Sequence, residues 1–200
     1  MHRRALKALL AAYRGRWPLE TATVARFDAF VDSHPDCFHR SCRVGHVTGS
    51  AWIVDMSGHR VLLAHHRKLG RWLQPGGHSD GDPDTLAVAL REAREESGLD
   101  VRALDDAIFD IDVHRIPARG REPAHFHFDV RFLVQAEHDR FRVSDESHAL
   151  AWVPAVGLGA LTDEESVLRM ARKWLARRAD GDEWRTTAER EPGSSPQRDA

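Results

Sequence analysis

The sequence predicts an α+β fold in which helices cover a β-sheet, an arrangement of α/β/α type. Two observations indicate it: short apolar runs of strand length recur between residues 47 and 153, and two amphipathic helical segments interrupt and close that region. The composition agrees, because 200 residues with 42% hydrophobic and 30% charged side chains are typical of one globular domain. We therefore expect one sandwich domain with a helical extension before it.

Residues 1–44 are expected to form that extension. Apolar residues recur at helical spacing on both sides of Pro18, namely at Leu6, Leu9, Leu10, Tyr13, Val24, Phe27, Phe30 and Val31. The basic N-terminus resembles a secretory signal, but its apolar run, Ala8 to Tyr13, has only six residues and no small-residue cleavage site follows. Two cysteines are too few for a disulfide framework. We therefore expect a cytoplasmic protein.

From about residue 45 the apolar residues follow the period of strands. The runs 51–54 and 61–64, separated by turn residues, predict a β-hairpin. Further strands are expected over 107–113, 126–134 and 150–153. These segments supply the sheet of the expected sandwich.

A long helix is expected after the turn Pro75-Gly76-Gly77. Asp82 is its expected N-cap, Pro83 suits the first helical position, and Gly98 can end it. A second helix is expected from Thr162, with Glu165 completing a capping box.

The remaining residues, 179–200, are polar and contain Gly, Ser and Pro, so we expect a disordered tail there.

Charge and hydropathy argue against two classes of partner. Lys and Arg number 29 against 31 Asp and Glu, so the net charge of −2 provides no polybasic field for nucleic acid. The longest uncharged apolar stretch, Ala149 to Leu161, has 13 residues, whereas a membrane-spanning helix needs about 20. We expect neither nucleic acid nor a membrane as a partner.

Three glutamates gather on one side of the predicted long helix. Glu92, Glu95 and Glu96 have the spacing i, i+3, i+4, which places their carboxylates in one sector beside the apolar face. Like charges at this spacing repel one another, and the helix dipole disfavours them in the last turn. Arg91 can pair with Glu95, and a hard divalent cation would neutralise the rest. A solvated acidic face is the alternative interpretation.

The same segment resembles a known family motif. Residues Gly77 to Leu99 match the pattern G-x5-E-x7-R-E-U-x-E-E-x-G-U, with U apolar, at every defined position except the first glutamate, which is Pro83 here. This segment resembles the Nudix box. With the strands and helix around it, the resemblance covers residues 45–178 and leaves the extension, 1–44, and the tail, 179–200, outside.

The resemblance implies a Nudix α/β/α sandwich, with a mixed central sheet between the box helix and a C-terminal helix. It implies an enzyme that uses Mg²⁺ or Mn²⁺ to hydrolyse a diphosphate (phosphoanhydride) bond in a small nucleoside-diphosphate derivative, by attack of water at phosphorus. The metal ligands would be Glu92, Glu96, the carbonyl of Gly76 and, directly or through water, Glu95. Arg91 would orient a glutamate of this group, and a carboxylate would take the proton of the attacking water.

Pro83 departs from the motif, since in the family this glutamate supports the metal cluster or pairs with the box arginine. One of the flanking aspartates, Asp80, Asp82 or Asp84, can take its role. Loss of such a supporting group can lower metal affinity or activity by about 10–100-fold.

Nudix hydrolases often take a further acid from a loop outside the box. Glu146 is our candidate for a base or extra ligand, with an ordinary turn acid as the alternative. His125, His127 and Asp129 alternate with apolar residues, so a strand places all three on one surface. We expect both histidines to line the substrate cleft and Asp129 to be a polar residue of a half-exposed strand.

Two further residues are candidates for binding substrate. His78 directly follows the glycine turn, and Arg67 belongs to a basic cluster between a strand and the box. A role within the loop and solvation are their respective alternatives.

Two other functions remain open. An isomerase on the same fold, such as isopentenyl diphosphate isomerase, would use histidine ligands and a cysteine, both of which this chain has. A non-catalytic nucleotide sensor is compatible with Pro83. The group attached to the diphosphate stays open, and the N-terminal helices could pack in a homodimer.

Overall fold

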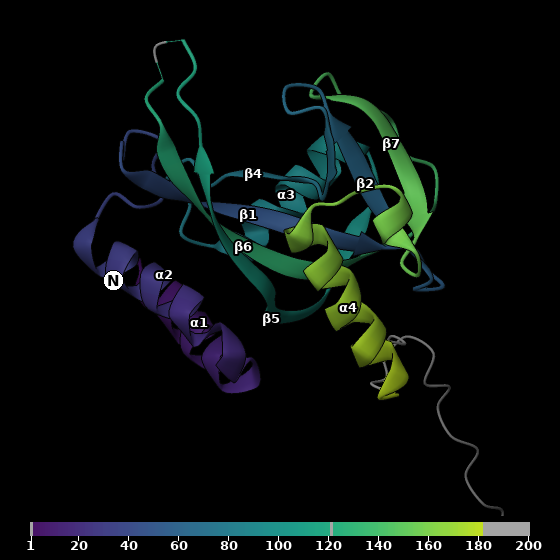
Figure 1. Cartoon of the computed structure of the whole chain (residues 1–200), viewed down its shortest axis with the longest axis horizontal. Helices are drawn as coiled ribbons and strands as arrows, with labels where there is room; N and C mark the ends of the chain where they lie inside the picture. Colours follow the sequence, from purple (N-terminus) through teal and green to yellow (C-terminus); the bar gives the residue numbers. More distant parts are fainter. Residues whose placement is uncertain (1, 121, 182–200) are drawn as a thin grey trace, which may run out of the picture.

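The computed structural model describes residues 2–120 and 122–181, in which one mixed sheet lies between two layers of helices (Figure 1). The strands in this part of the chain are β1 (Gly45–Val54), β2 (Arg60–His66), β3 (Arg71–Leu73), β4 (Gly76–His78), β5 (Val101–Ile116), β6 (His125–Ala136) and β7 (Ser147–Pro154). Their order is β3-β2-β1-β6-β5, with β4 attached to β1 and β7 to β2. Only β1 and β6 pair in parallel among the described strands. The α/β/α sandwich with a mixed sheet is thereby confirmed.

Three helices cover one face of the sheet. They are α1 (Arg4–Arg16) and α2 (Thr21–Ser33), joined by the 3₁₀ turn η1 (Pro18–Glu20), and α3 (Thr85–Ser97). Their apolar sides form one core with β1 and β6, which includes Leu10, Phe27, Val47, Ala89 and Val130. The expected N-terminal helices therefore pack on the same face as the box helix.

The other face is covered at one end by α4 (Glu165–Ala179), which follows the 3₁₀ turn η2 (Leu158–Ala160) (Figure 1). Met170 and Trp174 of α4 pack against Trp52 of β1 in a second core cluster. Because side chains alternate along a strand, the residues of β1 that share the face of Trp52 include His46 and Ser50. This face thus changes from apolar beneath α4 to polar toward the start of β1.

Helix α3 begins later in the chain than the sequence predicts. Its N-cap is Asp84, whose carboxylate accepts a hydrogen bond of 3.0 Å from the N–H of Ala87. Asp82 instead accepts the N–H of Asp84, so the predicted cap at Asp82 is wrong because a second aspartate lies closer to the first turn. Gly98 ends the helix as predicted, with φ 66° in the left-handed region.

Helix α4 also begins later than predicted. Its N-cap is Glu164, and the hydroxyl of Thr162 accepts the N–H of Glu164 in the preceding turn. The N–H of Thr162 bonds to the carbonyl of Leu158, so Thr162 lies in the turn between η2 and α4 and the predicted capping box is wrong. The expected tail, 179–200, lies outside the described residues from 182 onward.

Strand β5 is longer than predicted. It starts at Val101, but the pairing register shifts between Ala103 and Ile108. Asp105 and Asp106 interrupt the apolar run, so the sequence pattern does not predict the first part of this strand. Among the described residues, no helix is both long and apolar enough to cross a membrane.

Candidate active site

The glutamates of α3 lie against the two glycines of β4. The N–H of Gly76 donates a hydrogen bond of 2.7 Å to Oε1 of Glu96. At Gly77 the space for a side chain is already filled, because a Cβ there would lie 2.4 Å from the carboxyl group of Glu92. Only glycine lets β4 approach that carboxylate so closely. The glycine turn and two box glutamates therefore form one seat.

Arg91 holds Glu92 in this seat. Its Nη1 lies 3.0 Å from Oε1 of Glu92, and its Nη2 donates a 2.9 Å hydrogen bond to the carbonyl of His78. Glu95, the expected partner at i+4, lies 3.8 Å from the same Nη1, and its side chain is 60% exposed. Arg91 thus links Glu92 to β4.

The environment of the seat opposes negative charge. Burial raises the pKa of Glu96 to about 8, and the charges of Glu146 and Glu92 act in the same direction, while the hydrogen bond from Gly76 lowers it. Burial also raises the pKa of Glu92, where the Arg91 charge opposes the effect and Glu95 adds to it. A bound cation would reverse this balance by stabilising the ionised carboxylates.

The donors of the seat fit a hard divalent cation, which prefers carboxylate and carbonyl oxygens. Within residues 2–120 and 122–181, however, Glu92, Glu95 and Glu96 do not each bring an oxygen to within 4.8 Å of the other two. Repulsion among like charges and the exposure of Glu95 explain this spread. The structure brings Glu92 and Glu96 to the glycines and leaves Glu95 at the rim, where its side chain can turn.

The loop before β7 brings a fourth carboxylate to the site. Glu146 is exposed, and its charge helps to raise the pKa of both Glu92 and Glu96. Arg67 holds this loop, since its N–H donates to the carbonyl of Glu146 and its Nη2 to that of Ser147, both at 3.0 Å. In this structure Arg67 therefore positions the Glu146 loop.

Pro83, which replaces the first box glutamate, faces the N-terminal extension. It lines a small hollow together with Leu6 and Leu9 of α1. A glutamate at this position would place its charge against apolar side chains.

The flanking aspartates have other partners. Asp82 and Asp84 accept backbone N–H groups at the start of α3. Asp80 forms a two-pronged pair with Arg40, at 2.6 and 2.9 Å, although its charge still helps to raise the pKa of Glu92. None of the three forms an ion pair with Arg91 in the part of the chain described here.

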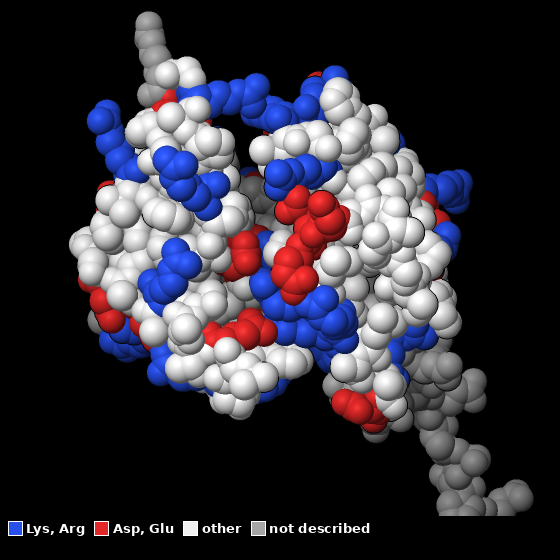
Figure 2. All heavy atoms as spheres, in the orientation of Figure 1, with Lys and Arg blue, Asp and Glu red and all other residues white. Residues whose placement is uncertain are grey.

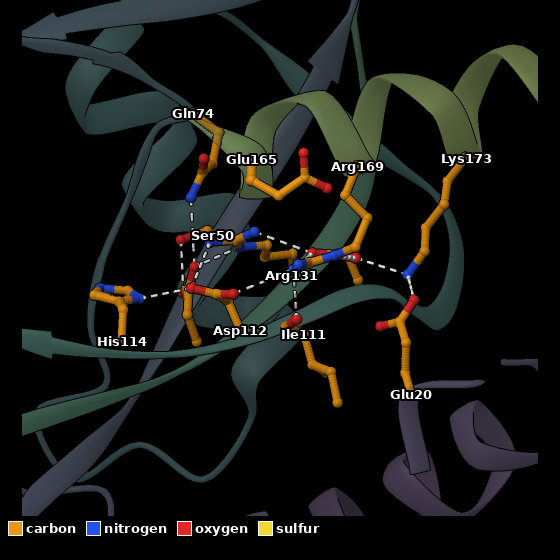
Figure 3. A network of polar contacts seen from close by, with 12 residues as sticks. Glu20, Ser50, Gln74, Ile111, Asp112, His114, Arg131, Glu165, Arg169 and Lys173 are labelled. Carbon is orange, nitrogen blue, oxygen red and sulfur yellow. Dashed lines mark hydrogen bonds and ion pairs between the residues drawn. The ribbon is translucent and has the colours of Figure 1, made fainter. Parts of the chain in front are cut away.

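A buried charge network crosses the face of the sheet on which α4 lies (Figure 3). Asp110 of β5, which is fully buried, lies 3.0 Å from Nη1 of Arg131, 2.8 Å from Nη2 of Arg169 and 2.7 Å from Nζ of Lys173. Arg131 also lies 3.6 Å from Asp112. Three cations from β6 and α4 therefore converge on one carboxylate.

Asp129 extends this network toward the start of β1. It is 2% exposed, accepts 2.8 Å hydrogen bonds from the hydroxyls of Thr48 and Ser50, and lies 2.7 Å from Nε of Arg131. The expectation of a half-exposed polar residue is wrong, because β6 lies between β1 and β5 and both neighbours cover Asp129. The sequence reasoning missed Arg131, although it continues the polar alternation of His127 and Asp129.

The predicted histidines lie at the same face, beyond Asp129. His125 and His127 meet His46 of β1 and His78 of β4, with ring centroids 4.9–5.2 Å apart in five of the pairs. The sequence did not lead us to group His46 with the other histidines, although it alternates with Thr48 in the same way. Figure 2 shows this face hollowed near its centre, with acidic and basic side chains mixed around the hollow.

A mixed sheet between helices, with two glutamates of residues 77–99 held against a glycine turn, is the arrangement that the Nudix resemblance implies. The family model described as "NUDIX domain" matches residues 45–189. The chain belongs to the NUDIX family, which confirms the resemblance of residues 77–99, and it is a Nudix-type pyrophosphohydrolase.

The chain is similar to solved structures of MutT and NUDIX proteins. One is the MutT protein from Methanosarcina mazei Go1, with 18% identity and a TM-score of 0.54 over 68% of this chain and 97% of that one. Another is a MutT NUDIX hydrolase from Burkholderia pseudomallei, with 25% identity and a TM-score of 0.49 over 63% and 95%. No curated protein matches the chain.

Proposed function

We propose that this protein uses Mg²⁺ or Mn²⁺ to hydrolyse a diphosphate bond in a small nucleoside-diphosphate derivative. The observation that carries the proposal is the seat in which Gly76 binds Glu96 and Gly77 leaves room for Glu92. All its donors are oxygens of the kind that hard cations prefer. Burial is the main cause of the raised pKa of both glutamates, and a bound cation would offset it by stabilising their ionised forms.

Each residue of the seat has a separate role in this proposal. When bound, the cation draws charge from the bridging phosphate oxygens and lowers the pKa of water. Glu92, Glu95 and Glu96 would hold it together with the carbonyl of Gly76, and Arg91 keeps Glu92 in place. The remaining carboxylate, Glu146, accepts the proton of the attacking water at its Oε.

The substrate is proposed to reach from this seat past β4 to the polar face on the other side of that strand. His78, His125 and His127 line one end of that face, and the loop held by Arg67 carries Glu146.

A substrate screen tests the proposal. The protein is incubated with Mg²⁺ or Mn²⁺ and a panel that contains nucleoside diphosphate sugars, dinucleoside polyphosphates, nucleoside triphosphates and isopentenyl diphosphate. We expect a phosphate-containing product from at least one nucleotide, and a fall in turnover of at least about 100-fold in Glu92→Gln. The exposed Glu137→Gln is the matched control and should retain full turnover.

Three results would contradict the proposal. Isomerised isopentenyl diphosphate without nucleotide cleavage would indicate the isomerase. Nucleotide binding with no product under either metal would indicate a sensor. Equal turnover in Glu92→Gln and the parent would remove the site assignment.

Gly77→Ala provides a second test of the seat. A Cβ at this position displaces the Glu92 carboxylate, and a shift of about 1 Å at a reacting site can lower the rate about 100-fold. We therefore expect a 10–100-fold fall in kcat in steady-state assays. Gly159→Ala, where a Cβ meets nothing within 4 Å, is the control. Equal kcat values in the two variants would show that the close approach at Gly77 does not matter.

A further inference from the structure

A second group of potential metal ligands lies on the opposite side of β4 from the glutamates. His46, His125 and His127 each offer one ring nitrogen such that all three nitrogens lie within 4.8 Å of one another. Among the residues that the structure describes, no other group of three or more His, Cys, Asp or Glu side chains meets this condition. The three rings come from two adjacent parallel strands, in which His46 is paired directly with His127.

The spacing of two of these nitrogens matches a shared ion. Nε2 of His125 and Nε2 of His127 are 3.3 Å apart. Two imidazole nitrogens bound at about 2.0–2.1 Å to a tetrahedral ion would be separated by about 3.3 Å as well. A ring nitrogen of His46 lies within 4.8 Å of both.

The tautomer of His125 directs a lone pair into the group. Its Nδ1 lies 2.9 Å from the carbonyl oxygen of Pro123, which can only accept, so Nδ1 carries the proton and donates it. Nε2 is then unprotonated and faces His127. Metal-binding histidines commonly have such a backbone carbonyl on their second nitrogen.

His46 supplies an independent observation. Its side chain is 2% exposed, yet neither ring nitrogen has a hydrogen-bond partner. The carbonyl of Cys42 is near enough to favour protonation of His46 slightly, but it does not reach hydrogen-bond geometry. A buried polar group without a partner is costly, and an ion bound by His46 would satisfy it.

We propose that His46, His125 and His127 form a second metal site, which takes a divalent transition-metal ion such as Zn²⁺ and leaves one coordination position open to the polar face. Three imidazoles without a carboxylate favour Zn²⁺ and its neighbours over Mg²⁺, which prefers oxygen.

The proposed site is separate from the glutamate seat. Along β4 the alternation of side chains directs position 77 toward Glu92 on α3 and His78 toward the other face, where its ring lies 4.9 Å from His46. The open position would therefore face the region between His78 and Asp129. An anionic oxygen of the substrate, or water, is the ligand that suits it.

Cobalt and zinc titrations of the metal-free protein test this proposal without an activity assay. We expect the visible spectrum of four-coordinate Co²⁺ at one equivalent, displacement of that spectrum by Zn²⁺, and no displacement by excess Mg²⁺. His46→Gln and His127→Gln should each weaken Co²⁺ binding at least 100-fold. Glu92→Gln should leave it unchanged, and so should the exposed His148→Gln, the matched histidine control.

Folding of the variants is checked by thermal unfolding without metal. If His46→Gln does not fold, His125→Gln and the zinc-dependent rise of Tm in the parent still decide the matter. Loss of the cobalt spectrum in Glu92→Gln would assign the ion to the glutamate seat and overturn the proposal. So would full Co²⁺ affinity in folded His127→Gln. Because the glutamate variant is tested in parallel, failure of this site and failure of the proposed hydrolase site give different results.

Discussion

Replacing Asp110 with asparagine is expected to lower the free energy of unfolding by about 3–5 kcal/mol, the effect typical of breaking a buried ion pair from one side. Asp110 is fully buried and faces Arg131, Arg169 and Lys173. The substitution keeps the shape of the side chain but leaves these cations with less buried negative charge. Urea unfolding at pH 7 measures the change.

The control for this variant is Asp139→Asn. Asp139 pairs with Arg60 at the surface, where its side chain is 49% exposed, so we expect a change below about 1 kcal/mol. A similar small change in Asp110→Asn would show that the buried network contributes little.

The parent and Asp110→Asn should also differ in how their stability changes at acid pH. Burial tends to raise the pKa of Asp110, but the hydrogen bond from Arg169 and the charges around it outweigh burial and hold that pKa below its ordinary value. A lowered folded pKa gives stability that is present above the unfolded pKa of about 3.9 and is lost as pH falls through the folded value. The parent should therefore lose stability below about pH 4 more steeply than Asp110→Asn.

Replacing Glu96 with glutamine should lower turnover at least about 100-fold and at the same time stabilise the metal-free protein. Its pKa of about 8 in the folded state exceeds the ordinary value of 4.5. Between these values the unfolded chain has released a proton that the folded chain keeps, so the stability of the metal-free parent falls as pH rises from about 4.5 to 8. Glutamine avoids this cost, by roughly 2–5 kcal/mol at pH 9.

Thermal and urea unfolding in EDTA across pH 5–9 measure this gain. Mg²⁺ should narrow this difference, since it stabilises the parent by about 2.7 kcal/mol at 100 times its Kd and the variant much less. Glu137→Gln, at an exposed position, should track the parent at every pH. If Glu96→Gln is less stable than the parent in EDTA at pH 9, burial does not raise the pKa of Glu96 as described.

The sequence predicted the elements that carry strong local signals. Gly98 ended α3 because few other residues adopt a left-handed φ at a helix end, and the alternation around His127 predicted its face correctly. The spacing of Glu92 and Glu96 on one helix placed both beside the glycine turn. Each of these features depends on residues that are close to one another in the sequence.

The rest depended on pairing between distant segments, which no local pattern specifies. Asp129 is buried because β1 and β5 flank its strand. His46 joins His125 and His127 only because β1 pairs in parallel with β6. Arg67 supports the loop of Glu146 through contacts with a segment far along the chain.

Lys173 connects the N-terminal extension to the buried charge network. This buried ammonium group of α4 lies 2.7 Å from Asp110, 2.6 Å from Glu20 and 2.6 Å from the hydroxyl of Tyr13. The family match begins at residue 45. A fragment that starts there would lack Glu20 and Tyr13, two of the partners of this buried ammonium group. In such a fragment, Asp110 would be the one remaining partner among these three for the ammonium group of Lys173.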